Sequence, residues 1–302
     1  MAQTGYCVEL PSAARVKKTR ILCSVFPVWL FARNVTSGSL AVQLDLMLPA
    51  AMGCPHDYVL TPQDMEKIAL ADVLIINGLG LEEFIGAPLK KANPKIVVID
   101  ACKEISPMMM KSEGDGHGDA HLHSEANPHL FASPRMAGQM VSNIAIQLAK
   151  IVPAEAQLYA RNAASYSIRL TRLGEELSGA VRQLRARRVM TTHAVFDYLA
   201  GDAGLEIAAV IEETPGQEPS AADMLRLIKT IKESKVAAVF TEPQYPDRTA
   251  RTIAREAGAP VAALDPVASG PQGAPMDYYE QAMRRNVKVL KETLGGTGRV
   301  KE

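Results

Sequence analysis

The chain has 302 residues, and 33 Lys and Arg side chains balance 33 Asp and Glu side chains. This length exceeds what one hydrophobic core ordinarily fills, so two domains are expected. A balanced charge gives no support for nucleic-acid binding, and no apolar run is long enough to span a membrane.

The first half of the chain alternates between short apolar runs and helical segments. Thr61 and Pro62 are typical of a helix start, with Thr as the N-cap and Pro at the first helical position. Strands that alternate with helices predict βαβ units and a parallel sheet. The predicted strands are residues 20–26, 42–48, 71–77 and 95–100, and the predicted helices are residues 28–35, 62 onward and 134–151.

A single long helix is predicted between the two halves. Apolar residues such as Leu170, Leu173 and Leu177 recur at helical period between residues 154 and 186. At 1.5 Å per residue this helix would span about 50 Å, the length of a whole domain. We therefore predict a linking helix, residues 153–186, between an N-terminal lobe and a C-terminal lobe.

The βα alternation resumes after that helix. Together the segments predict an α/β fold of two Rossmann-like lobes with parallel sheets, joined by one long rigid backbone helix. The predicted strands of the second half are residues 189–192, 207–211, 237–240 and 261–264, and its helices are 220–234, 247–257 and 277–294. The predicted domains are a tail (1–19), the N-terminal lobe (20–152), the linking helix (153–186) and the C-terminal lobe (187–302).

Three dispersed histidines are the first candidates for metal ligands. His56, His129 and His193 each lie where an apolar segment gives way to a turn, and Asp265 follows the last predicted strand. Ligands of open α/β sheets bind beyond the carboxyl ends of the strands, so two facing lobes could bring these side chains together. Three imidazoles and one carboxylate suit tetrahedral zinc. Taken singly, a histidine is more often a surface or core residue, and an aspartate there could cap a turn.

The other three histidines form a separate cluster. His117, His121 and His123 lie within seven residues of a polar segment, residues 112–125, that is rich in Gly and Asp. This composition favours a loop, and short His-rich tracts commonly bind metal weakly. We expect an accessory metal-binding loop there.

The four cysteines leave alternatives open. Cys7, Cys23, Cys54 and Cys102 form no Cys-x-x-Cys motif, which argues against a zinc finger, and their disulfide state stays open. Cys54 lies two residues before His56, where a thiolate could bind zinc. An unpaired cysteine is more often a small buried apolar residue.

The fourth metal ligand also stays open, among Asp265, Glu213, Glu242 and water. Both glutamates would lie in loops at the cleft, where either could act as the general base of a zinc hydrolase. Such an enzyme needs three ligands and an activated water. The chain contains no GxSxG, HExxH or Gly-rich phosphate motif that would support a catalytic alternative.

A series of motifs in fixed order resembles the metal-binding solute-binding proteins of ABC transporters (cluster A-I), most closely the zinc-uptake branch. The match covers about residues 20–297. Its ligand motifs are Pro55-His56-Asp57-Tyr58, Asn127-Pro128-His129, Thr192-His193-Ala194 and Leu264-Asp265-Pro266. The resemblance implies two lobes, a long rigid helix, and a cleft metal held by the three histidines, with Asp265 as the fourth ligand. A His-rich loop before the second ligand is typical of the zinc branch.

The resemblance also implies a function. The protein would be no enzyme but a monomer that captures Zn²⁺ and delivers it to an ABC permease on the periplasmic or extracellular face of a membrane, without binding nucleic acid. A family member that carries manganese (Mn²⁺) or iron, a zinc hydrolase and a surface adhesin are the alternatives.

Three departures from the family pattern stand out. Asn127 replaces the usual Asp, and Cys54 stands where Glu or Ser is common. Residues 1–19 lack the apolar core of a secretory signal, so we expect either an intracellular protein or a signal outside the chain as given.

Overall fold

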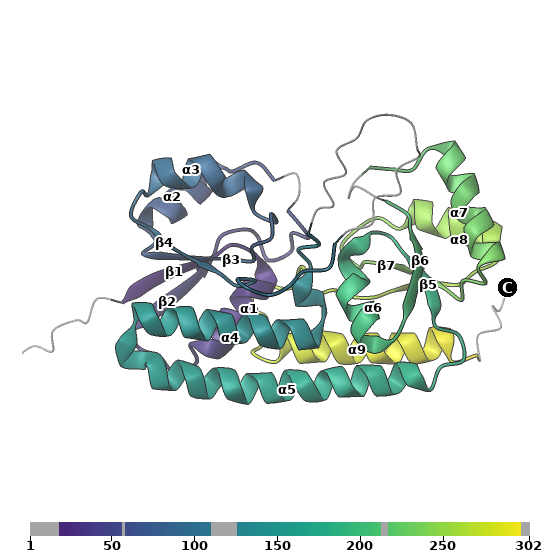
Figure 1. The fold of residues 1–302 in the computed structure, drawn as a ribbon. Coiled ribbons are helices and arrows are strands. Elements are labelled where there is room, and N and C mark those ends of the chain that lie inside the picture. The colour runs from purple at the N-terminus through teal and green to yellow at the C-terminus, as the bar shows by residue number, and fades with distance from the viewer. Residues whose placement is uncertain (1–17, 56–57, 110–125, 213–216, 297–302) are drawn as a thin grey trace, which may run out of the picture.

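Two α/β lobes stand side by side on a layer of long helices (Figure 1). The computed structural model describes residues 18–55, 58–109, 126–212 and 217–296. Each lobe contains one four-stranded sheet in which all paired strands are parallel. The predicted fold class is confirmed. Among the described residues, no helix combines the length and apolar character needed to cross a bilayer.

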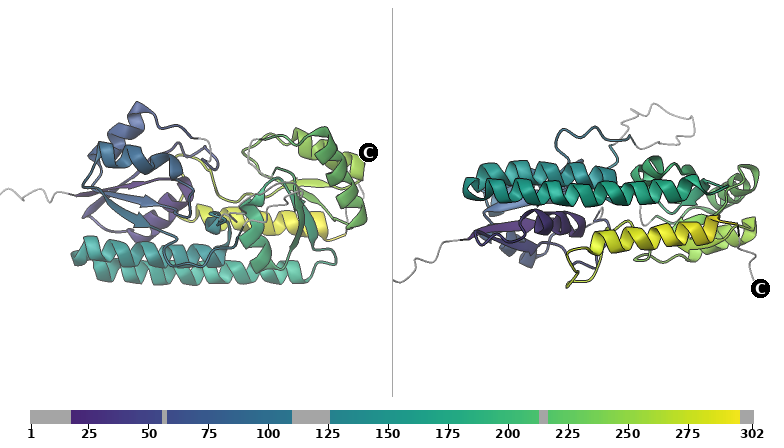
Figure 2. Two further views of the ribbon diagram at one scale, coloured as in Figure 1. Left: turned by 45° about the horizontal axis from the view of Figure 1, so that its top comes forward. Right: turned by 90° about the horizontal axis from the view of Figure 1, so that it is seen from below.

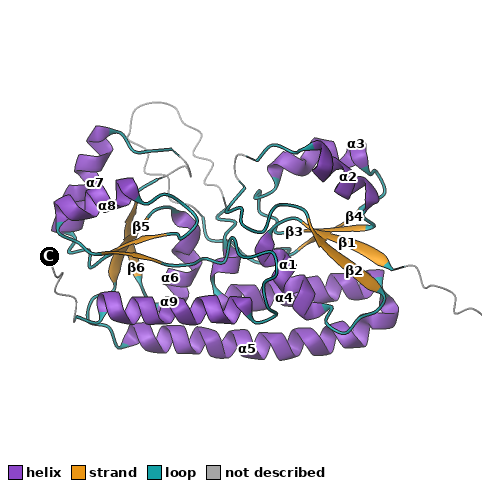
Figure 3. Ribbon diagram, turned by 180° about the vertical axis from the view of Figure 1, so that it is seen from behind, coloured by secondary structure: helices purple, strands orange, loops and turns teal. Residues whose placement is uncertain are grey.

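The sheet of the N-terminal lobe has the strand order β2-β1-β3-β4. Its central strands, β1 and β3, are buried because helices cover both faces of the sheet (Figure 3). The strands are β1 (Thr19–Cys23), β2 (Val42–Leu46), β3 (Val73–Ile76) and β4 (Val97–Asp100). The helices are α1 (Phe26–Val35), α2 (Pro62–Leu70), α3 (Gly86–Ala92) and α4 (Pro134–Ile151).

The C-terminal lobe repeats this topology. Its strand order is β6-β5-β7-β8, so both lobes read 2-1-3-4 when the strands of each are counted from its own start. The strands are β5 (Arg188–Thr191), β6 (Glu206–Val210), β7 (Val239–Thr241) and β8 (Val261–Ala263). The helices are α6 (Asp197–Ala203), α7 (Ala221–Glu233), α8 (Arg248–Ala257) and α9 (Tyr278–Leu294).

Helix α5 (Ala156–Arg182) runs beneath both lobes and has α4 and α9 beside it (Figure 2). Its 27 residues correspond to about 40 Å, less than predicted, because the 3₁₀ turn Pro153–Glu155 precedes it and because it ends at Arg182, four residues before the predicted end. Arg169 of α5 lies 3.1 Å from the buried carboxylate of Glu280 in α9, measured from Nε to Oε1. The long helix is therefore tied to both lobes.

One hydrophobic core continues from the first lobe into the second. It includes four buried aromatic rings, from α1, α5, α6 and α9: Phe31, Tyr166, Tyr198 and Tyr279. A smaller core lies between the second sheet and helices α7 and α8. Rotating the lobes apart as rigid bodies would expose the shared rings to water, which is unfavourable.

Two helices do not follow from the sequence pattern. Helices α3 and α6 have seven residues each, too few to show a helical period in a window of about 11–18 residues. Helix α6 ends at Gly204, whose φ of 84° closes the helix with a left-handed residue.

Candidate metal centre

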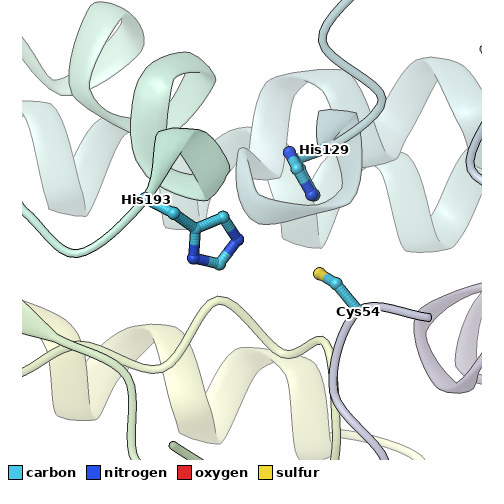
Figure 4. A group of neighbouring side chains, drawn as sticks. All are labelled: Cys54, His129 and His193. Carbon is cyan, nitrogen blue, oxygen red and sulfur yellow. The ribbon is translucent and has the colours of Figure 1, made fainter. Parts of the chain in front are cut away.

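Three potential metal ligands meet between the lobes: Cys54, His129 and His193 (Figure 4). One ligand atom of each residue lies within 4.8 Å of the other two. Cys54 belongs to the segment after β2, His129 precedes the 3₁₀ turn Leu130–Ala132, and His193 lies two residues beyond β5. The group thus forms where segments that follow strands face each other across the cleft.

His129 is held by the amide of Asn127. The side chain of His129 is buried, and Oδ1 of Asn127 lies 2.8 Å from its Nδ1 while accepting its backbone N–H at 3.0 Å. An amide oxygen only accepts hydrogen bonds, so Nδ1 carries the proton. Nε2 is then the nitrogen that can bind a metal.

Asn127 also connects the two halves of the site. Its Nδ2 donates to the carbonyl of Ala194 at 2.9 Å and to Oδ2 of Asp197 at 3.0 Å. The hydroxyl of Tyr198 donates to the carbonyl of Asn127 at 2.8 Å. The His129 segment is therefore tied to the residues directly after His193. An aspartate, which the resemblance leads us to expect at this position, could not donate these hydrogen bonds when ionised.

His193 is held by Glu242, the residue after β7. Nδ1 of His193 lies 2.5 Å from Oε1 of Glu242, and both side chains are buried. The second carboxylate oxygen of Glu242 accepts from Nε2 of Gln244 at 2.6 Å. Nε2 of His193 is buried, and among the described residues it has no hydrogen-bond partner. A buried imidazole nitrogen in this position is a group that could bind a metal ion.

The thiol of Cys54 completes the group. The residue as a whole is partly exposed, and its backbone N–H donates to the hydroxyl of Tyr245 at 2.9 Å. Burial of the thiol, and to a lesser extent the charge of Glu242, raise the pKa of Cys54 well above its usual value. The thiol is therefore neutral at pH 7 unless a metal binds to it.

Asp265 lies outside this group of three. It follows β8 as predicted, but its Oδ1 accepts from the N–H of Val267 at 2.8 Å, and its Oδ2 lies 3.7 Å from Nη2 of Arg285. Burial raises the pKa of Asp265, while the hydrogen bond from Val267 and the charge of Arg285 act against this. Its role as the fourth ligand stays a prediction.

Several predicted site residues lie outside the described residues, and their roles stay predictions. They are His56, His117, His121, His123 and Glu213.

A cavity of about 520 Å³ opens beside the metal-ligand group. Its described wall includes the carboxylates of Glu212, Glu218 and Glu242 and one guanidinium, that of Arg248. Three negative charges against one positive charge make this approach attractive to cations.

The family model of ZnuA, the periplasmic component A of the zinc-uptake complex, matches residues 21–293. The chain belongs to the ZnuA family. This is a family of transport proteins that bind metal, not a family of enzymes, and it confirms the predicted resemblance.

Individual relatives support the same assignment to the ZnuA family. The chain is 29% identical over 287 residues to the zinc-binding lipoprotein AdcA of Streptococcus pneumoniae, covering 93% of this chain and 57% of AdcA. It is 28% identical over 286 residues to the high-affinity zinc uptake system protein ZnuA of Bacillus subtilis, covering 92% and 88%. The chain thus spans little more than half of the streptococcal AdcA length.

A solved structure shows the same fold. FpvC from Pseudomonas aeruginosa, in complex with Mn²⁺, has a TM-score of 0.79 and 28% identity, covering 93% of this chain and 100% of FpvC.

Two orienting residues of the site are not evident from sequence. Asn127 stands out only as a departure from the usual Asp, and Glu242 only as an alternative ligand or base. Ligand histidines commonly donate their second N–H to an oxygen. The signal that could have identified both residues is that each places an oxygen beside one of the histidines, His129 or His193.

Proposed function

We propose that the protein is an extracytoplasmic solute-binding protein that captures Zn²⁺ between its lobes and delivers it to an ABC permease. The observation that carries this proposal is the pair of buried imidazoles, His129 and His193, whose rings lie 5.4 Å apart. An oxygen lies beside Nδ1 of each ring, so Nε2 is the nitrogen of each ring that could bind a metal. AdcA and ZnuA, relatives of this chain, bear names that refer to zinc.

His56 and Asp265 are proposed as further ligands of the same ion. His56 is two residues from Cys54, and Asp265 follows β8 at the same edge of the second sheet as His193 and Glu242. The segment with His117, His121 and His123 is proposed to gather zinc or to sense its abundance. Imidazoles must be neutral to bind a metal, so zinc affinity should fall as the pH drops through the range in which imidazole takes up a proton.

Release of zinc is proposed to need local shifts and no large hinge. Helix α5 and the shared aromatic core hold the lobes together, so their relative rotation is costly. The smaller core under α7 and α8 is separate, so that layer can move without disturbing the shared core. The layer of α7 and α8 within the C-terminal lobe is therefore the proposed moving part. The protein is proposed to act as a monomer.

A hydrolase is disfavoured by the contacts of Glu242. Its Oε1 lies beside Nδ1 of His193, and its Oε2 accepts from Gln244. Both carboxylate oxygens therefore already contact protein groups. A general base must instead face the attacking water. We expect no turnover of ester or peptide substrates by the zinc-loaded protein.

Isothermal titration of the metal-free protein with zinc tests the proposal. We expect one tight site, weakened in His56→Ala, His129→Ala and His193→Ala by more than the roughly 10–100-fold typical of lost outer-shell partners. His121→Ala is the matched control and should keep the tight site. Unchanged affinity in all three ligand variants would exclude the site. Competition between zinc and manganese separates the main proposal from the manganese alternative that the FpvC complex suggests.

A further inference from the structure

We infer that Cys54 is itself a metal ligand and that its thiolate selects thiophilic divalent cations such as Zn²⁺. This inference rests on the proposed function. It identifies Cys54 as the residue that would determine which metal the protein binds. The sulfur lies within 4.8 Å of a ligand atom of His129 and of His193, and it points toward the space between the two rings (Figure 4). A second observation is independent of the cysteine: buried Nε2 of His193 has no hydrogen-bond partner within the described part of the chain.

The sulfur is held in place by contacts that join the lobes. The backbone N–H of Cys54 donates to the hydroxyl of Tyr245, which follows β7 in the second lobe. Four residues earlier, the carbonyl of Ala50 accepts from the N–H of Gly270 at 2.8 Å. A side chain at Gly53 would collide with the phenol of Tyr245, so only glycine lets the loop approach so closely. The loop that carries Cys54 is thus attached to the lobe that carries His193.

The three ligand atoms fit three of the four positions of a tetrahedral zinc ion after a small contraction, and either His56 or Asp265 would fill the fourth. Zinc bonds of about 2.3 Å to sulfur and about 2.0–2.1 Å to nitrogen place tetrahedral ligand atoms roughly 3.3–3.6 Å apart. Since 4.8 Å is the upper limit, the ligand atoms need to close by at most about 1.2–1.5 Å, which small changes of side-chain torsions can provide.

A purely structural role would place Cys54 differently. Cys23 and Cys102, the other cysteines in the described part of the chain, are buried in the hydrophobic core with exposures of 0% and 2%. Cys54 is partly exposed and lies in the wall of the cavity with His193 and Glu242. It is therefore placed to meet a cation that enters the cleft.

A thiolate changes which metals the site prefers. Sulfur is a soft ligand that favours zinc, whereas manganese prefers carboxylates, carbonyls and water. Since FpvC is known in complex with Mn²⁺, the same fold accommodates either preference. In this chain Cys54 would shift the balance toward zinc.

X-ray absorption at the zinc edge tests the inference on the zinc-loaded full chain. The wild type should show one sulfur at about 2.3 Å beside nitrogen or oxygen at about 2.0–2.1 Å. Cys54→Ser should lose the sulfur shell and keep the nitrogen shell. Its zinc affinity relative to its manganese affinity should fall at least about tenfold, the lower end of what even an outer-shell loss costs.

The other cysteines supply matched controls. Cys7→Ser, Cys23→Ala and Cys102→Ala should all retain the sulfur shell. If the wild type binds zinc tightly without a sulfur shell, or if the shell persists in Cys54→Ser, the inference is wrong and the proposed function stands. If the wild type does not bind zinc, the proposed function itself fails. The wild-type spectrum decides the matter even if Cys54→Ser does not fold.

Discussion

The side chain of Asn127 performs two tasks: it orients His129, and it ties the His129 segment to the residues after His193. Replacing Asn127 should separate them. Asn127→Ala removes the acceptor at Nδ1 of His129 and both donors toward Ala194 and Asp197. Loss of an outer-shell partner typically weakens metal binding by roughly 10–100-fold, or about 1.4–2.7 kcal/mol. Each hydrogen bond lost typically costs about 0.5–1.5 kcal/mol, so the metal-free protein should also unfold more easily.

Asn127→Asp should keep the orientation of His129 and weaken only the connection to Ala194 and Asp197. The carboxylate still accepts from His129 and strengthens that imidazole as a ligand, so zinc affinity should equal or exceed that of the wild type. It cannot donate to Ala194, and it places a second negative charge beside Asp197. The free energy of unfolding should therefore fall by about 1–3 kcal/mol.

Competition titration with a chromophoric zinc chelator measures the affinity, and urea unfolding of the metal-free protein measures the stability. Asn162→Ala is the matched control. It removes an amide that donates to the carbonyls of Val35 and Ser37, at 3.0 and 2.8 Å, in the N-terminal lobe. It should lower stability and leave zinc affinity unchanged. The reasoning is refuted if Asn127→Ala binds zinc like the wild type, or if Asn127→Asp loses as much affinity as Asn127→Ala.

Three further predictions follow from the site and its surroundings. Glu242→Gln removes the charge beside Nδ1 of His193 and should weaken zinc binding about tenfold in the same titration. Deleting residues 112–124 should leave the tight site intact and lower only the total zinc bound at saturation, as equilibrium dialysis would show. Burial raises the pKa of Glu82 from 4.5 to about 7, so its contribution to stability is complete below about pH 4.5 and is lost as the pH rises through 7. Compared with Glu82→Gln, the metal-free wild type should lose roughly 3 kcal/mol of unfolding free energy between pH 4.5 and 8, measured in urea.

Each of these predictions has a contradicting result. Wild-type zinc affinity in Glu242→Gln would remove Glu242 from its orienting role. A deletion that abolishes tight binding would make the His-rich segment part of the main site. Parallel pH profiles for the wild type and Glu82→Gln would show that Glu82 ionises alike in the folded and unfolded chain.

Most of the secondary structure could be predicted because its causes are local. Apolar runs such as residues 71–77 predict buried strands, and β3 lies within that run, at residues 73–76. The capping box at Thr61, with Asp64 as the reciprocal partner, starts α2 where the Thr-Pro pair predicts it. The short helices α3 and α6 could not be predicted, because seven residues carry too little periodic signal.

The sequence by itself determined the α/β alternation, the long linking helix, the family, and the placement of His129 and His193 in segments at the cleft. These properties follow from periodic burial and from motif order along the chain. Only the tertiary structure showed that the sulfur of Cys54 lies with the two imidazoles, while the carboxylate of Asp265 lies with Val267 and Arg285. Likewise, only the folded chain revealed that Asn127 and Glu242 orient the histidines. The physical reason is that side-chain direction in a loop depends on packing between distant segments, such as Gly53 against Tyr245, and no local period encodes it.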